Sequence, residues 1–272
     1  MIEIAEAIPF AHQANEILKN LEIVDVSIWN TPHKFAWINQ PENKYLELKG
    51  RKIVSVESSA HYIRFIFDHQ EELAIAEDLF ISYQKISDSD HKSQLSFTFC
   101  NGYELSFKVK LYGFLLLGSK EELYKQQMYY QKAIDAISPL HQAFTYDYFI
   151  NQTGLNLGKG SVKEALATKQ HLTGIGNGVL QDILFHAKIN PKRKINTLNE
   201  HDKKVLYQAL IDTIKDMADK GGRDTQLNIL GSFGKYQTIM HTKREDCPIC
   251  HNKLTKEAYL GGKVIYCPVC QI

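Results

Sequence analysis

Four cysteines near the end of the sequence carry its clearest chemical signal. Cys247-Pro-Ile-Cys250 and Cys267-Pro-Val-Cys270 are two C-x-x-C pairs separated by sixteen residues. Two such pairs at this spacing are typical of a tetrahedral thiolate site, and Zn²⁺ suits four sulfur ligands because it needs no redox chemistry. Four thiolates leave no position for water, so the pattern predicts one structural zinc ion, with a rubredoxin-like iron site as the alternative. The fifth cysteine, Cys100, is interpreted as a small buried side chain in a strand next to a hairpin turn.

A glycine-rich stretch ahead of an expected helix is the second candidate site. It contains Gly174-Ile-Gly-Asn177-Gly178 and precedes a helix expected over residues 178–187. Glycines before a helix let the backbone approach a phosphate, and the free N–H groups of the first turn point at the anion. The stretch follows no strand, which argues against a dinucleotide site. Asn177 is placed either to cap the helix or to donate to a phosphate, and an ordinary turn is the simpler interpretation.

The first part of the chain predicts one helix followed by strands. Apolar residues recur at helical spacing within residues 3–19, at Ile4, Ala7, Ile8, Ala11, Ala14, Ile17 and Leu18. Short runs rich in β-branched and aromatic residues follow, at 53–56, 62–67, 94–99 and 104–109. Asn101-Gly102 between two of these runs is a strong hairpin signal. Residues 1–118 are therefore expected to form a helix and an antiparallel sandwich or barrel.

The second part predicts helices. Helical segments are expected at residues 120–137, 145–153, 161–169, 178–187 and 200–220. The cysteine-bearing end, residues 247–272, is too short to bury a core and needs the metal as a staple. The overall expectation is an α+β protein of two domains.

Composition sets wider limits. The chain has 272 residues, of which 44% are apolar and 23% charged, so it is neither disordered nor fibrous. No apolar run approaches the ~18 residues of a membrane span, and the start lacks the features of a secretory signal. Residues 1–150 hold 14 basic against 20 acidic side chains, whereas 151–272 hold 18 against 11. A basic half beside an acidic one suggests that one part faces a polyanion.

Together these motifs resemble the formamidopyrimidine-DNA glycosylase / endonuclease VIII family. The stretch 161–198, with Gly174-Ile-Gly-Asn177 and Asn190-Pro191, is similar to that family's helix-two-turn-helix, and the finger ending in Cys267-Pro-Val-Cys270-Gln271 matches in spacing and position. The resemblance is specific over about residues 150–272 and weaker over 1–118. It implies a β-sandwich domain at 1–118, a connecting segment at 119–144, a helix-two-turn-helix domain at 145–240 and a zinc finger at 241–272.

The start of the chain departs from the family. Family enzymes attack the sugar with the N-terminal amine of a proline, which is exposed when the initiator Met is removed. Position 2 is Ile here, and this bulky residue is expected to leave Met1 in place. The resemblance then implies Met1 (through its primary amine) and Glu3 as the catalytic candidates. Glu3 and Glu6 are equally well explained as acidic residues favoured by the helix dipole.

The resemblance also implies a set of DNA contacts. The expected residues are Asn177, Lys263, Lys110, Arg223, His61 and Tyr112. His61 stands where the family has a lysine, and Tyr112 stands where a wedge enters the gap left by a flipped base. The acidic pair Glu77-Asp78 replaces part of a family segment and would repel phosphates.

The function predicted is binding of damaged or distorted double-stranded DNA, with glycosylase and AP-lyase chemistry weak or lost because Ile2 replaces the proline. The alternative is an active glycosylase / AP lyase that uses a primary N-terminal amine with Glu3 as acid/base. An RNA or protein partner is a third possibility. A cytoplasmic protein is expected, associated with the nucleoid when bound to DNA, with no membrane and no obligate protein partner.

Overall fold

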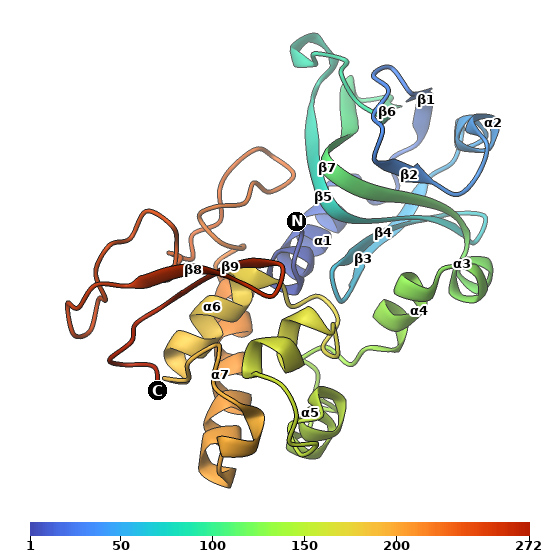
Figure 1. Ribbon diagram of the computed structural model, residues 1–272. Coiled ribbons are helices and arrows are strands. Elements are labelled where there is room, and N and C mark those ends of the chain that lie inside the picture. Colours follow the sequence, from blue (N-terminus) through green and yellow to red (C-terminus); the bar gives the residue numbers. More distant parts are fainter. The chain divides into compact units, whose positions relative to one another are not determined.

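The computed structural model describes residues 1–272, which form two compact units (Figure 1). Unit 1 combines Met1–Asp135 with Gly221–Lys235, and unit 2 combines Ala136–Lys220 with Tyr236–Ile272. The boundaries of these units differ from the domain boundaries expected from the motifs. The motif-based boundaries remain a prediction. Residues 221–235 belong to unit 1 because they return to its sheet, where the N–H of Tyr83 donates to the carbonyl of Ile229 over 2.9 Å.

Unit 1 is built on one long sheet. Its elements are α1 (Ile4–Leu18), β1 (Ile23–Ile28), β2 (Ala36–Ile38), α2 (Glu42–Leu46), β3 (Ile53–Ser59), β4 (Tyr62–Phe67), β5 (Glu71–Lys85), the 3₁₀ helix η1 (Ile86–Asp88), β6 (Leu95–Phe99), β7 (Tyr103–Ser119), α3 (Lys120–Gln126) and α4 (Met128–Asp135). The strand order is β1-β6-β7-β5-β4-β3, all antiparallel, and β2 pairs with β7 in parallel. The parallel pair was not expected from the sequence, because a three-residue strand carries almost no periodic signal.

The sheet folds over itself to enclose the main core. Strand β5 bends at a bulge between Glu77 and Leu79, so the long strands β5 and β7 contribute to both layers. Rings from strands that are not neighbours in the sheet then meet across the core: Phe65 of β4 lies 5.4 Å from Phe107 of β7 in an edge-to-face contact. This layering is the expected antiparallel sandwich. The hairpin at Asn101-Gly102 is also confirmed, with Gly102 at φ +81°. The expected burial of Cys100 is wrong: this residue follows the end of β6, begins the turn and is exposed.

Helix α1 covers one end of the core. Its apolar stripe, which includes Ala7, Phe10, Ala14 and Leu18, is buried with the strands. Ile2 belongs to the same core although it precedes the helix, and it is 9% exposed. The N-terminal segment is therefore held in place by apolar packing.

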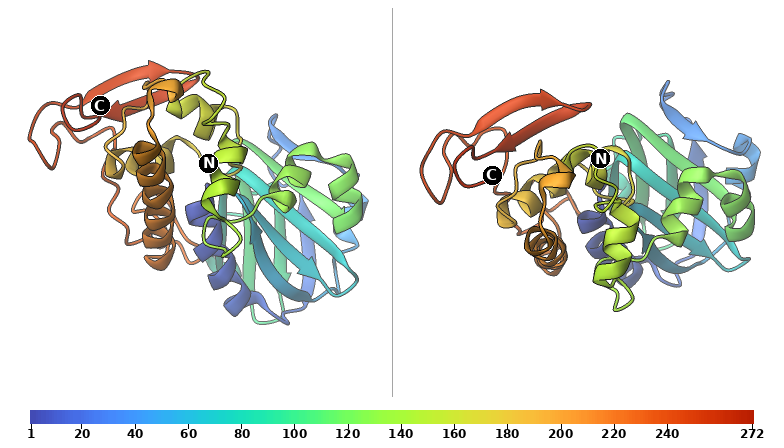
Figure 2. Two further views of the ribbon diagram at one scale, coloured as in Figure 1. Left: turned by 90° about the horizontal axis from the view of Figure 1, so that it is seen from below. Right: turned by 60° about the horizontal axis from the view of Figure 1, so that its bottom comes forward.

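Unit 2 contains the remaining helices and a small hairpin. Its elements are α5 (Tyr146–Thr153), the π-helix η2 (Glu164–Thr168), α6 (Asn177–His186), the 3₁₀ helix η3 (Ile195–Thr197), α7 (Glu200–Asp219), β8 (Thr255–Tyr259) and β9 (Gly262–Tyr266). Helix α6 packs against both α7 and β9 (Figure 2). None of the helices combines the length and apolar character that a membrane span requires.

Two expected helices differ in detail from those observed. The segment 120–137 is two helices, α3 and α4, because Gln127 adopts an extended conformation at φ −118° and ψ 95°. The segment 161–169 is irregular and contains the π-helix η2. Periodicity predicted the helical character in both cases, but not these local breaks.

Candidate metal centre, N-terminal site and nucleic-acid interface

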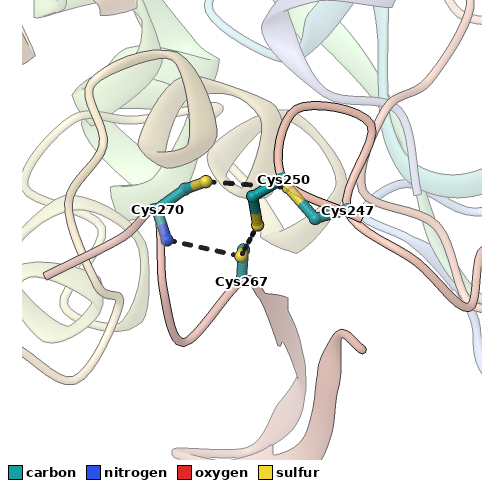
Figure 3. A group of neighbouring side chains, drawn as sticks. All are labelled: Cys247, Cys250, Cys267 and Cys270. Carbon is teal, nitrogen blue, oxygen red and sulfur yellow. Dashed lines mark hydrogen bonds between the residues drawn. The ribbon is translucent and has the colours of Figure 1, made fainter. Parts of the chain in front are cut away.

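The four cysteines converge in unit 2 as a candidate metal centre (Figure 3). Their sulfur atoms all lie within 4.8 Å of one another. The Cys250 and Cys267 sulfurs are 3.4 Å apart, and those of Cys247 and Cys270 are 3.8 Å apart. A tetrahedron with metal–sulfur bonds of about 2.3 Å has edges of about 3.8 Å. The donor set and its spacing therefore fit one tetrahedral ion.

Buried polar side chains attach this metal centre to the helices. Gln271 is 1% exposed; its Oε1 accepts from the N–H of Cys267, and its Nε2 donates to the carbonyl of Ile189 beyond α6. Asp182 of α6 is fully buried and accepts from the N–H groups of Ile239 and Met240 at 2.9 and 2.7 Å. Burial raises the pKa of Asp182, and these two hydrogen bonds oppose the rise. The segment before the cysteines is thus anchored to α6.

The hairpin β8–β9 brings its turn to the start of α6. Leu260 and Gly261 form the turn with φ of 46° and 74°, the left-handed pair expected of a two-residue hairpin. A Cβ added to Gly262 would lie 2.3 Å from Nδ2 of Asn177. Glycine is therefore required at this position unless Asn177 moves. Lys263, the next residue, is exposed.

Asn177 is the first residue of α6, and the residue that caps the helix is Gly176. The cap interpretation of Asn177 is therefore wrong, and its side chain faces the hairpin turn instead. Asn177 and Lys263, two of the expected DNA contacts, lie at one place in unit 2, although they are 86 positions apart in the sequence.

Lys163 is a buried residue that the sequence analysis missed. It is 1% exposed, and its Nζ donates to the carbonyl of Tyr259 at the hairpin turn over 2.6 Å. Burial without a carboxylate partner lowers the pKa of this lysine. The sequence offers little signal for this burial, because Lys163 stands beside Glu164 in a mixed helical segment and lysines are usually exposed.

In unit 1, the N-terminal amine lies against an acidic strand. The Met1 ammonium donates to Oδ1 of Asp78 over 2.8 Å, and the N–H of Ile2 donates to the carbonyl of Glu77 over 2.8 Å. Glu77 has φ +81°, because it occupies the bulge of β5. The sequence analysis treated Asp78 only as a charge that repels phosphate. Its role as counter-ion of the amine depends on the fold, since no local pattern joins positions 1 and 78.

Glu3 and Glu6 form a buried ion-pair group with Arg223. Arg223 Nε donates to Oε1 of Glu6 over 2.5 Å, its Nη2 lies 3.5 Å from Oε1 of Glu3, and all three residues are at most 7% exposed. The backbone N–H of Glu3 also donates to Oε2 of Glu6 at the start of α1. The backbone of Gly234 packs closely against the segment that carries the arginine. A Cβ on Gly234 would lie 2.1 Å from the carbonyl oxygen of Gly222.

Two of the expected DNA contacts, Arg223 and His61, are buried side chains in this structure. Arg223 is 4% exposed and engaged with carboxylates, so it is not a surface cation. His61 is 8% exposed, and its Nε2 lies 3.6 Å from Oε1 of Glu77. Burial alone would raise the pKa of Glu77, but His61, Tyr112 and the N-terminal ammonium together hold it below its ordinary value. Inside unit 1, Arg223 thus pairs with the carboxylates of Glu3 and Glu6, and His61 lies beside the carboxylate of Glu77.

The other two expected contacts in unit 1 reach the surface. Lys110 is exposed, with its Nζ 5.6 Å from the centre of the Phe80 ring. Tyr112 is 47% exposed, and partial burial followed by the charge of Glu77 raises its pKa. Both side chains are placed where a partner of unit 1 can touch them.

Comparison with known proteins adds to this geometry. Residues 136–228 match the formamidopyrimidine-DNA glycosylase H2TH domain. A formamidopyrimidine-DNA glycosylase of Bacillus cereus is 27% identical over 235 residues, covering 82% of each chain, and one of Shouchella clausii is 24% identical over 270 residues, covering 94% of each. Residues 136–228 therefore carry the H2TH domain of the formamidopyrimidine-DNA glycosylases (Fpg), and most of the chain is similar to proteins of that name.

Solved structures of Fpg proteins share the fold of this chain. The MutM (Fpg) protein of Thermus thermophilus has a TM-score of 0.83 at 19% identity, with 99% of this chain and 98% of that chain covered. Lactococcus lactis Fpg in complex with DNA containing an abasic site has a TM-score of 0.86 at 22% identity, with 99% of each chain covered. The two-domain α+β fold expected from the sequence is confirmed.

Proposed function

We propose that this protein binds damaged or distorted duplex DNA as an Fpg/Nei-type repair protein, and that its glycosylase and AP-lyase chemistry is weak or absent. The H2TH match, the similarity to formamidopyrimidine-DNA glycosylases and the complex of Lactococcus lactis Fpg with abasic-site DNA support the DNA partner. The proposal that the chemistry is weak or absent depends on the ion pair of 2.8 Å between the Met1 amine and Asp78.

The position of the amine disfavours the family's chemistry. With Met1 retained, the amine stands one residue further from Glu3 than a proline at position 2 would, a shift of up to ~3.6 Å. A misplacement of about 1 Å can already cost ~100-fold in rate. The amine must also leave Asp78 before it can attack a sugar carbon, and Glu3 is engaged with Arg223. Each of these contacts opposes the reaction.

The alternative is an active glycosylase / AP lyase that uses the primary amine of Met1 with Glu3 as acid/base. One observation favours it: the Met1 side chain is 36% exposed, so the N-terminus is accessible from solvent. Such an amine can form a Schiff base with the ring-opened aldehyde of an existing abasic site, a step that needs no base excision.

Borohydride trapping distinguishes the two proposals. The protein is incubated with oligonucleotide duplexes that carry an abasic site or an oxidised base, and borohydride reduces any Schiff base to a stable adduct. We expect tight binding with little or no adduct on oxidised bases. Robust excision of an oxidised base by protein whose intact mass includes Met1 would contradict the proposal.

The four cysteines are proposed to hold one structural Zn²⁺. Since four thiolates fill its coordination shell, the ion would hold the hairpin β8–β9 in place and take no part in bond breaking. We expect about one zinc per chain when the unfolded protein is analysed for metal. Iron in place of zinc would support the rubredoxin-like alternative, and the absence of any stoichiometric metal would contradict the site.

Metal removal is predicted to loosen the end of the chain, because folding of a small metal site is coupled to binding of its ion. After chelation, hydrogen exchange should accelerate in residues 247–272, while the sheet of unit 1 keeps its protection. DNA affinity should fall with it, since Lys263 belongs to the hairpin. Unchanged exchange in these residues would contradict a structural role for the ion.

Replacement of Asn177 by Ala is predicted to weaken DNA binding by about 1–3 kcal/mol, as loss of a charge-assisted hydrogen bond to phosphate would. Fluorescence anisotropy with an abasic-site duplex measures the change. Gln208→Ala, which removes an exposed amide from α7, is the matched control and should bind like the parent. The parent's affinity should also fall steeply as the salt concentration rises. Each phosphate contact should add about one unit to the slope of log K against log[salt]. A flat salt dependence together with an unchanged Asn177→Ala variant would exclude this interface.

A further inference from the structure

A row of exposed aromatic side chains lies where β2 meets β7. Ala36 is opposite Gly113 and Trp37 is opposite Phe114 in this parallel pair, and the N–H of Gly113 donates to the carbonyl of Phe35 over 3.0 Å (Figure 1). Continuing the register by one residue places Phe35 beside Tyr112. Side chains of paired residues project from the same face of a sheet and alternate along each strand.

The register therefore separates two faces of β2. Ala36 and Ile38 pack against the main core. Phe35, Trp37 and Tyr112 project from the other face, and we call these three residues the aromatic row. They are 52%, 63% and 47% exposed. Single exposed apolar residues are common on protein surfaces, but three large exposed rings on the same face of two paired strands indicate a surface for a partner.

Lysines accompany the aromatic row. Lys34 Nζ lies 5.5 Å from the centre of the Phe35 ring, and Lys110 is two residues before Tyr112. Neither lysine forms an ion pair with a carboxylate of this chain. The nearby acids are already compensated, Glu77 by His61 and Asp78 by the Met1 ammonium. The patch thus combines flat apolar rings with free positive charge.

This combination matches one chemistry of partner. Proteins bind single-stranded nucleic acid by stacking bases on aromatic side chains while cations follow the phosphates. A lipid surface or a protein partner would use the apolar area but would not need a lysine such as Lys34 placed at one of the rings.

The position of the row relates it to the N-terminal site. Gly113 is opposite Glu77 in the β5–β7 ladder, and the carbonyl of Glu77 holds the N–H of Ile2. Bases that stack on Tyr112 would therefore lie beside the N-terminus.

We propose that the aromatic row of Phe35, Trp37 and Tyr112 stacks unpaired nucleobases of DNA, with Lys34 and Lys110 on the adjoining phosphates. The proposal rests on the DNA-binding function proposed above and narrows its substrate class. The preferred DNA contains unpaired bases, as in a bubble or gap, and is not a fully paired duplex with one altered base.

The test compares DNA probes with the parent and a Phe35→Ala/Trp37→Ala variant. Fluorescence anisotropy is measured with an intact duplex, a duplex of the same sequence with a three-base bubble, and the single strand. We expect the parent to prefer the bubble. The variant should lose about 5- to 150-fold in bubble affinity for each stacked base that is lost, and bind the intact duplex within twofold of the parent.

A matched control and a second readout keep the test specific. Tyr103→Ala removes an aromatic ring opposite Lys85, ten residues along β7 from Gly113, and should leave the bubble preference unchanged. The chain has two tryptophans, so Trp29→Phe leaves Trp37 as the only indole. Its emission should be quenched by the bubble and by the single strand.

The possible failures can be told apart. If the parent binds intact duplex and bubble equally, the aromatic row is not a base-stacking surface, while duplex binding stands. If the double variant loses duplex and bubble affinity by the same factor, the stacking proposal is likewise wrong. If the parent binds the single strand with quenching of Trp37 but ignores every duplex, the aromatic row is supported and the proposed duplex-repair function fails.

Discussion

Replacement of Arg223 by Met is expected to destabilise the protein by about 3–5 kcal/mol, the usual cost of removing one partner from a buried ion pair. The variant leaves Glu3 and Glu6 buried without the cation that contacts both of them. Denaturant unfolding followed by circular dichroism measures the change in the free energy of unfolding. Lys49→Met is the matched control, because the exposed pair of Lys49 and Asp25 should contribute at most about 1 kcal/mol.

The same variant should show a characteristic pH dependence. Burial raises the pKa of Glu6 above its ordinary value even beside Arg223, which is the main influence in the opposite direction. Removing the arginine raises that pKa further. A carboxyl group whose pKa is higher in the folded than in the unfolded state contributes stability at low pH, and this contribution is lost as the pH rises through the folded-state pKa. The destabilisation should therefore be larger at pH 8 than at pH 4, and an equal loss at both would show that Glu6 is not the affected group.

Replacement of Ile2 by Pro is expected to raise the yield of borohydride-trapped adduct by as much as ~100-fold, the factor that a misplacement of about 1 Å can cost. Removal of the initiator Met would expose a secondary amine one residue closer to Glu3 and would leave Asp78 without its present partner. The measurement is the rate of adduct formation on an abasic-site duplex, with intact mass confirming the loss of Met1.

Ile2→Leu is the control for this change. Leu keeps an apolar side chain for the core position that Ile2 fills, and its size should retain Met1. Its trapping yield should equal that of the parent. If the proline variant loses Met1, folds normally and still forms no more adduct than the leucine variant, the spacing of the amine does not limit the chemistry, and Glu3 or its partner Arg223 becomes the cause to test.

Local sequence patterns were enough for most of the architecture. The helix α1, the strands β3, β4 and β6, and the helices α5, α6 and α7 agree with their expected positions to within a few residues. The hairpin at Asn101-Gly102 and the convergence of the four cysteines were also predictable. Periodic burial, turn residues and ligand spacing are properties of short stretches of chain, and they hold regardless of what the rest of the molecule does.

The side-chain partners at the candidate site are what the sequence alone did not indicate. His61 and Arg223 look like free cations in the sequence, yet the fold buries both against Glu77, Glu3 and Glu6. Asp78 and Met1 become partners across 77 positions, and Lys163 becomes a buried contact of the hairpin turn.

The sequence by itself determined the class of fold, the cysteine spacing of the candidate metal centre and the departure at Ile2, because each depends on residue types and short spacings. The tertiary structure alone decided which charges are free. The free energy of a charge depends on its burial and on the partner that long-range folding supplies. Lys110 and Lys263 therefore remain charged groups at the surface, whereas Arg223 is buried and paired with carboxylates.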